Sequence, residues 1–265
     1  MDVHEIPSRH LGTARRITVL SPRRQSTRAG FPVLYLNDGQ NLFDPSRAFG
    51  GVTWGVAETV RRLVRRRRIP PLIVVGIDHG ESLRSREYLP IEDDRNPEAR
   101  DPLGRQYVEF VTRDVIPFVE RRYPAARGAA NRGFGGSSYG AAAVLFAVLQ
   151  KPGRFGRLLL ESPSLYVGHE YLLRRARSAA RWPSRVYLGV GTHETRRRDW
   201  NEETVGNVRA LEAILRRSGL GPQRLHVVVE EGATHSEAAW ASRLPGALEF
   251  LFGPPDAAGL TLTRS

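Results

Sequence analysis

The chain has 265 residues, of which 40% are hydrophobic, and it carries a formal net charge of +12 at pH 7. It contains no cysteine, which excludes disulfide bonds, thiol catalysis and thiolate metal ligands. It also lacks any run of about 18 apolar residues, so the sequence predicts no transmembrane helix. Because α/β folds commonly reach about 250 residues as one unit, we expect a single domain over residues 1–265.

The positive charge raises the question of a nucleic-acid partner, but its distribution does not support one. Of the 40 basic residues, Lys151 is the one lysine and the other 39 are arginines, a pattern typical of codon bias. The densest arginine run, at 61–68, lies on a predicted helix and has no aromatic neighbours to stack on bases. The opposite face of that helix is apolar and carries Val52, Val56, Val60, Leu63 and Val64. We therefore predict a small-molecule partner and no nucleic acid.

Along the chain, short apolar runs alternate with stretches of helical spacing. Residues 16–20 alternate between apolar and polar side chains, as a half-buried strand does, and stop before Pro22. Continuously apolar runs predict further strands at 32–37, 72–77, 157–160, 185–190 and 224–230. Apolar residues at three- and four-residue intervals, or filling a segment completely, predict helices at 107–119, 141–149, 205–215 and 237–252.

Continuously apolar strands separated by helices indicate the α/β class, with a mostly parallel sheet covered by helices on both faces. In such sheets the chemistry gathers in loops beyond the carboxyl ends of the strands. The polar, proline-containing segment 82–103 predicts an ordered excursion or partial lid without secondary structure. We expect residues 254–265 to form a frayed tail. The first 16 residues are polar and lack the apolar core of a signal peptide, which predicts a cytoplasmic protein.

The pentapeptide G-S-S-Y-G at 136–140 fits the nucleophile-elbow pattern G-x-S-x-G. Such a serine sits on a tight, strained turn between a strand and a helix, where side chains two residues away would collide and glycines do not. The start of the helix also presents backbone N–H groups to a developing oxyanion. A strand-like segment precedes the pentapeptide and an apolar helix follows it, so we predict Ser138 as a nucleophile.

Other interpretations of this glycine-rich segment are weaker. An inert serine in a tight glycine turn stays the alternative, and Ser137 lacks the flanking glycines of an elbow nucleophile. A phosphate-binding loop is excluded because Ala141 and Ala142 stand where that motif needs Lys and Ser or Thr.

A serine nucleophile needs an adjacent base near neutral pH, and the base needs an acid that orients it. With the chain order serine, acid, histidine, only His226 and His235 lie far enough along the chain. His226 falls inside a predicted strand, whereas His235 lies in the loop before the last helix. We predict His235 as the base.

The acid should follow the predicted strand at 185–190, and Glu194 lies in that loop. A buried glutamate bonded to His235 would hold the imidazole tautomer and stabilise the imidazolium formed during attack. We predict Glu194 as the acid, with Asp199 in reserve and a solvated surface glutamate as the alternative. His79 and His193 also follow predicted strands, but their spacing matches no metal motif. We therefore predict no metal and no other cofactor.

Taken together, these residues resemble the Putative esterase family of the α/β-hydrolase superfamily. That family includes esterase D, enterochelin-type siderophore esterases, feruloyl esterases and the mycolyltransferases. The resemblance covers most of the chain and is carried by five segments in the right order, at 33–44, 115–123, 136–140, 191–194 and 235–240. It implies an α/β-hydrolase fold and serine esterase activity.

The resemblance also implies an oxyanion hole formed by the backbone N–H groups of Gln40 and Tyr139. These positions agree with the general rule that the donors are the residue after the nucleophile and one in the loop after the third strand. Trp54, Tyr88 and Trp240 are candidates to line the substrate pocket, with packing in the core as the alternative. The segment 86–88 resembles the family too, and its role stays open between structure and substrate contact.

The leading functional hypothesis is hydrolysis of a carboxylic ester through an acyl-enzyme. An acyltransferase, in which an alcohol replaces water, would use the same residues, and a non-catalytic binding protein would keep the fold alone. A complete set of serine, histidine and glutamate favours catalysis. The acyl and alcohol groups of the substrate and the oligomeric state are left open by the sequence.

Overall fold

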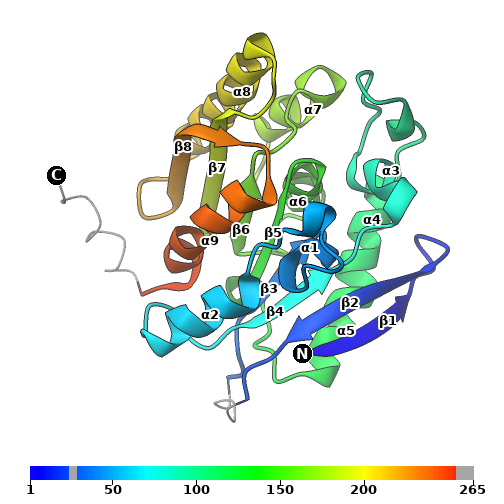
Figure 1. The fold of residues 1–265 in the computed structure, drawn as a ribbon, viewed down its shortest axis with the longest axis vertical. Coiled ribbons are helices and arrows are strands. Elements are labelled where there is room, and N and C mark those ends of the chain that lie inside the picture. The colour runs from blue at the N-terminus through cyan, green and yellow to red at the C-terminus, as the bar shows by residue number, and fades with distance from the viewer. Residues whose placement is uncertain (24–28, 255–265) are drawn as a thin grey trace.

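Figure 1 shows the fold of the protein in a computed structural model that describes residues 1–23 and 29–254. These residues contain one sheet of eight strands in the order β1–β2–β4–β3–β5–β6–β7–β8. The pairs β1–β2 and β2–β4 are antiparallel and all later neighbours are parallel, which confirms the predicted α/β class. The strands are β1 (Asp2–Pro7), β2 (Ala14–Leu20), β3 (Val33–Asn37), β4 (Ile73–Ile77), β5 (Arg132–Ser137), β6 (Arg157–Glu161), β7 (Arg185–His193) and β8 (Leu225–Thr234).

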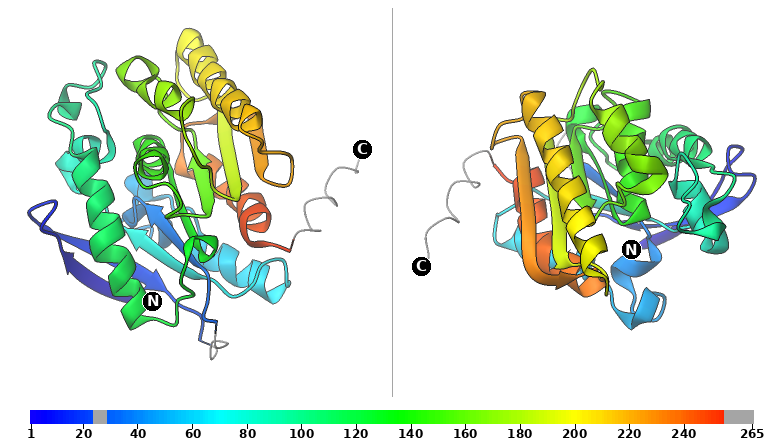
Figure 2. Two further views of the ribbon diagram at one scale, coloured as in Figure 1. Left: turned by 180° about the vertical axis from the view of Figure 1, so that it is seen from behind. Right: turned by 90° about the horizontal axis from the view of Figure 1, so that it is seen from above.

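Helices cover both faces of the sheet. α1, α2 and α9 lie in front of it in Figure 1, and α4 to α8 cover the other face, seen from behind in the left view of Figure 2. No helix within 1–23 and 29–254 combines the length and apolarity needed to cross a membrane. The helices are α1 (Gln40–Phe43), α2 (Val56–Arg65), α3 (Arg84–Tyr88), α4 (Gly104–Glu109), α5 (Ile116–Arg122), α6 (Tyr139–Gln150), α7 (Val167–Ala176), α8 (Arg198–Arg217) and α9 (Glu237–Phe252).

The central strands β3 and β4 are buried at every position and are almost continuously apolar, because helices cover both faces of the sheet. In β3, Val33 and Tyr35 belong to the core beneath α4 to α8, whereas Leu34 and Leu36 belong to the core beneath α2 and α9. Successive side chains of a strand point to opposite faces, so two helical layers require two apolar sets. This is the physical origin of the continuous runs in the sequence.

Several elements differ from the prediction. The arginine-rich helix α2 begins at Val56, so the prediction was wrong for Val52, which lies outside the helix and is 45% exposed. The segment 82–103, expected to lack secondary structure, contains α3 and a 3-10 turn at Pro97–Ala99. β1 and α7 were not predicted; in β1 only Ile6 is buried, which leaves no apolar pattern to detect. Of the predicted tail, residues 255–265 lie outside the described residues.

A buried ionic cluster fixes α9 against the sheet. Arg243 of α9 donates through Nε to Glu161 at the end of β6 (2.9 Å) and through Nη1 to Glu230 in β8 (2.6 Å). Arg243 is 6% exposed and Glu161 is 1% exposed. Burial raises the pKa of Glu161, and the guanidinium of Arg243 opposes that shift. The cluster therefore anchors the helix that follows His235.

We expect Arg243→Ala to lower the free energy of unfolding by about 3–5 kcal/mol, because it leaves a buried carboxylate without its partner. The matched control is Arg216→Ala, which breaks an ion pair with Glu212 on the surface of α8 and should cost at most about 1 kcal/mol. Urea unfolding of both variants measures the difference, and equal losses would contradict the assigned role of the cluster.

Candidate active site

Polar residues collect where four neighbouring parallel strands end. Ser138 directly follows β5, Ser162 follows β6, Glu194 follows β7 and His235 follows β8. Because parallel strands end at one edge of the sheet, residues far apart in the chain gather there. This edge is the candidate active site.

Ser138 has the backbone of an elbow. It caps the N-terminus of α6 with φ 56° and ψ −128°, a conformation that residues with a side chain rarely adopt. A Cβ on Gly136 would lie 2.8 Å from the carbonyl carbon of Gly140, and a Cβ on Gly140 would lie 2.9 Å from a carboxylate oxygen of Asp38. Glycine is needed at both positions because any larger residue would meet these atoms.

The two expected oxyanion donors begin two helices. Gln40 is the first residue of α1 and Tyr139 is the first residue of α6, so neither N–H has an acceptor within its own helix. Neither backbone N–H donates a hydrogen bond to any other group in the described part of the chain. Two free N–H groups at the carboxyl edge of the sheet are what an oxyanion site requires.

Helix α3 holds the turn that carries Gln40. Asp38 in this turn has φ 55° and is 5% exposed. Arg84 donates to both carboxylate oxygens of Asp38, through Nε at 2.7 Å and Nη2 at 2.9 Å, and the backbone N–H of Asp38 donates to the hydroxyl of Tyr88 at 3.1 Å. Helix α3 thus forms hydrogen bonds with both the side chain and the backbone of Asp38.

A second contact joins this turn to the nucleophile helix. Asn37 donates through Nδ2 to the carbonyl oxygen of Gly140 at 2.8 Å, and the hydroxyl of Tyr107 donates to Oδ1 of Asn37 at 2.6 Å. Asn41 in α1 donates to Oε1 of Glu237, the first residue of α9, at 3.1 Å. The segments that contain Gln40, Tyr139 and His235 are therefore linked by direct hydrogen bonds.

Glu194 and His235 are brought together. Nδ1 of His235 lies 2.5 Å from Oε2 of Glu194, whose residue is 7% exposed. The other oxygen, Oε1, accepts from the backbone N–H of Gly191 at 2.6 Å and from the hydroxyl of Ser162 at 2.7 Å. Burial alone raises the pKa of Glu194, but the hydrogen bonds and charge of His235, with Ser162 and Gly191, outweigh it and lower the pKa below its usual value. The carboxylate therefore stays charged.

His235 is oriented but not bonded to the serine. Its side chain is 35% exposed, and its ring meets the ring of Trp240 edge to face, with centroids 5.0 Å apart. Because Nδ1 is hydrogen-bonded to Glu194, Nε2 is the nitrogen that is available to a reacting group. Within the described residues no hydrogen bond joins His235 to the hydroxyl of Ser138. Such contacts are often long without substrate and shorten when it binds.

The alternative candidates lie elsewhere. Asp199 is exposed and pairs with Arg197 at 2.6 Å, so it is not the partner of His235. His226 lies in β8, where its ring packs on Tyr187 and Phe250. Across 1–23 and 29–254, no group of three or more His, Asp or Glu side chains could hold a metal ion.

The three candidate pocket residues are buried. Trp54 and Trp240 are each 4% exposed, with ring centroids 5.9 Å apart, and Tyr88 is 0% exposed. Their rings pack in the interior of the protein and expose little surface that a substrate could contact. Sequence reasoning missed Ser162 and Arg84, although Ser162 lies only two residues after the strand predicted at 157–160, which was a usable signal.

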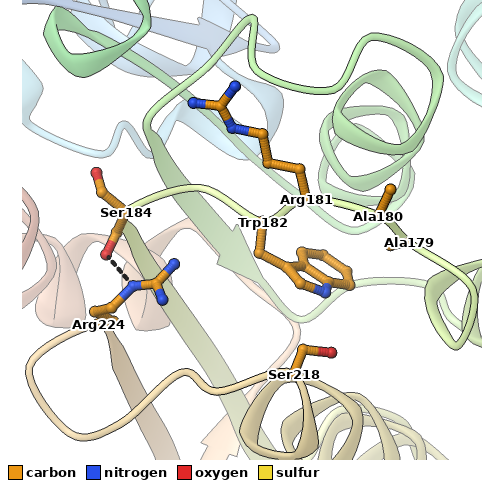
Figure 3. A pocket seen from close by; sticks show the side chains of 7 residues that line it. All are labelled: Ala179, Ala180, Arg181, Trp182, Ser184, Ser218 and Arg224. Atoms are coloured by element: carbon orange, nitrogen blue, oxygen red, sulfur yellow. Dashed lines mark hydrogen bonds between the residues drawn. The ribbon is translucent and has the colours of Figure 1, made fainter.

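One cavity of the protein lies away from this edge. The cavity in Figure 3 has a volume of about 630 Å³ and is lined by Ala179, Ala180, Arg181, Trp182, Ser184, Ser218 and Arg224. Ser184 and Arg224 each directly precede a strand, β7 and β8, so this cavity lies at the amino ends of the strands. Nε of Arg224 donates to the carbonyl oxygen of Ser184 at 3.3 Å, which serves the local fold. The cavity is therefore separate from Ser138.

Comparisons with known proteins identify the family of this chain. Residues 8–251 match the family model described as Putative esterase. The chain is 26% identical over 252 residues to the uncharacterized protein YbbA of Bacillus subtilis (strain 168), covering 93% of this chain and 96% of YbbA. It is 28% identical over 188 residues to the Ferri-bacillibactin esterase BesA of the same organism, covering 66% of this chain and 62% of BesA.

The fold is shared with a solved esterase. The enterobactin esterase FES from Shigella flexneri superposes with a TM-score of 0.70 at 22% identity, over 94% of this chain and 58% of FES. At this identity the likeness shows the fold alone. The chain spans less than two thirds of the length of BesA and of FES.

We expect Gly136→Ala to destabilise the protein by about 1–3 kcal/mol, because its Cβ would overlap the backbone of Gly140. The control is Gly206→Ala on α8, where no atom lies within 4 Å of the new Cβ. That variant should gain about 0.5–1 kcal/mol from the higher helix propensity of alanine. Thermal unfolding distinguishes the two, and a stable Gly136→Ala protein would argue against a crowded elbow.

Proposed function

The chain belongs to the Putative esterase family, and we propose that it hydrolyses carboxylic esters through an acyl-enzyme formed on Ser138, with His235 as general base and Glu194 as the acid that orients it. The observation that carries the proposal is the hydrogen bond between Nδ1 of His235 and the buried carboxylate of Glu194. It assigns Nδ1 as the protonated nitrogen and leaves Nε2 as the basic one. A base with that tautomer is the one that a serine nucleophile needs.

In the first half of the reaction, Oγ of Ser138 attacks the ester carbonyl and its proton passes to Nε2 of His235. The negative charge moves to the carbonyl oxygen, where the free N–H groups of Gln40 and Tyr139 can donate to it. The carbon–oxygen bond of the leaving alcohol then breaks, and His235 returns the proton to that oxygen. The acyl group stays on Ser138.

In the second half, water takes the place of the alcohol. His235 accepts a proton from the water as its oxygen attacks the acyl carbonyl, and the same two N–H groups stabilise the new oxyanion. The bond to Oγ of Ser138 breaks, the serine regains its proton from His235, and the free acid leaves. Glu194 keeps its charge throughout and stabilises each imidazolium.

The substrate that we propose is a small-molecule ester. The names of BesA and FES favour siderophore esters as the first natural substrates to assay, beside short nitrophenyl esters. The net charge of +12 would also draw anionic esters toward the protein at low ionic strength.

We expect Ser138→Ala to lower kcat/KM for a nitrophenyl ester by about 10⁴-fold, as the loss of a triad nucleophile does. A fluorophosphonate should label the wild-type protein on the peptide that contains Ser138 and should not label the variant. Ser137→Ala, the neighbouring buried serine, is the control and should keep most of the activity. A Ser138→Ala protein that retains its rate would rule out the acyl-enzyme.

We expect Glu194→Gln to lower kcat by about 10⁴-fold, since an amide of the same size favours the wrong imidazole tautomer. The matched control is Asp199→Asn, the exposed carboxylate that pairs with Arg197. It should leave kcat unchanged. If instead the two variants lose activity equally, Glu194 is not the orienting acid.

A further inference from the structure

A second strained serine lies beside the proposed triad. Ser162 directly follows β6, has φ 43° and is 1% exposed. Positive φ at a residue with a side chain persists only where the surroundings fix it, and such residues cluster at functional sites. Nothing in the ester chemistry described above uses this side chain.

The hydroxyl of Ser162 has two partners with fixed roles. The indole Nε1 of Trp240 lies 3.0 Å from Oγ of Ser162, and an indole N–H can only donate. Oγ therefore accepts from Trp240, and its single proton is directed to Oε1 of Glu194 at 2.7 Å. An ionised carboxylate accepts only, which gives the same direction.

Trp240 contacts both Ser162 and His235. Besides its hydrogen bond to Ser162, its ring meets the ring of His235 edge to face at 5.0 Å. Trp240 lies in the first turn of α9, and Arg243 anchors the same helix to β6 and β8. The position of the indole is thus set by the contacts of α9 with the sheet.

Resting on the proposed function, we propose that Ser162 is a positioning residue of the esterase: its hydroxyl, oriented by Trp240, fixes the carboxylate of Glu194 so that Oε2 faces His235. Together with the backbone N–H of Gly191, it occupies Oε1 and prevents the carboxylate from turning. Oε2 then has one partner, the imidazole. The hydroxyl acts through Glu194 and does not contact the substrate.

The effect of the Ser162 hydroxyl on Glu194 can be measured from the pH dependence of activity. His235 faces Oε2, and Glu161 lies close by but is paired with Arg243. The hydrogen bond from Ser162 helps to lower the pKa of Glu194, so its loss should raise that pKa. Activity should then fall off at a higher pH on the acid side.

The test compares Ser162→Ala with Ser164→Ala in the wild-type chain, using a short nitrophenyl ester. Ser164 is also buried, at 6% exposed, and lies in the same loop, but among the described residues its hydroxyl forms no hydrogen bond with Glu194 or His235. Loss of one hydrogen bond to a charged group predicts a fall in kcat of about 10- to 100-fold for Ser162→Ala, with KM little changed. The acid limb of its kcat/KM profile should move to higher pH, and Ser164→Ala should match the wild type.

Two further variants keep the test decisive. Ser162→Gly removes the hydroxyl while suiting the positive φ, so it should stay folded and lose as much activity as Ser162→Ala. Trp240→Phe keeps the aromatic packing but removes the N–H donor, and it should shift the acid limb in the same direction by less.

The positioning role of Ser162 and the proposed esterase function can be tested separately. If Ser162→Ala and Ser162→Gly keep the wild-type kcat and acid limb while Ser138→Ala is inactive, Ser162 has no positioning role and the proposed function stands. If Ser138→Ala itself retains activity, the proposed function falls first. A loss of activity in Ser162→Gly without movement of the acid limb also overturns the positioning role.

Discussion

A carboxylate buried at one edge of the sheet is the feature on which the rest of the site depends. Glu194 is almost completely shielded from water, and its charge is stabilised by donors from three places: Gly191 in β7, Ser162 after β6, and His235 after β8. Removing a charge from water is costly unless hydrogen bonds replace the hydration. The fold must therefore bring these donors together, and in doing so it orients the imidazole.

The opposite side of the site is organised in a similar way. The turn at Asp38 and the elbow at Ser138 both hold strained backbone, and both leave an N–H group free at the start of a helix. Arg84 of α3 binds the side chain of Asp38 in the turn, and Asn37 donates a hydrogen bond from the turn to Gly140 of α6. Preorganised donors of this kind need no reorganisation when charge develops, which is why they contribute so much to ester hydrolysis.

Much of this could be predicted from the sequence, for physical reasons. Strands buried on both faces are apolar at every position, and the elbow needs glycines that leave a recognisable spacing. The same reasoning fails where the signal is not local. β1 is an edge strand with one buried side chain, and α3 is a single turn whose role depends on a contact between Arg84 and Asp38, 46 residues apart. Ser162 carries no motif, because its importance comes from Glu194 after β7 and Trp240 in α9, which only folding brings near.

The loops beyond the strands also explain how a single edge can hold so many polar groups. Each of the strands β5 to β8 contributes the residue that follows it, and α9 is held against the sheet by Arg243. His235 lies in the short connection between β8 and α9, where its ring meets the indole of Trp240 edge to face.

The central claim is that Ser138, His235 and the two free N–H groups act on one carbonyl. A crystal structure of the protein after reaction with a phosphonate ester tests it most directly. The account predicts phosphorus bonded to Oγ of Ser138, and a phosphoryl oxygen about 2.7–3.1 Å from the backbone nitrogens of Gln40 and Tyr139. It also predicts that Nε2 of His235 faces the adduct. An adduct on another residue, or an imidazole turned away from it with Glu194 still bound to Nδ1, would contradict the account.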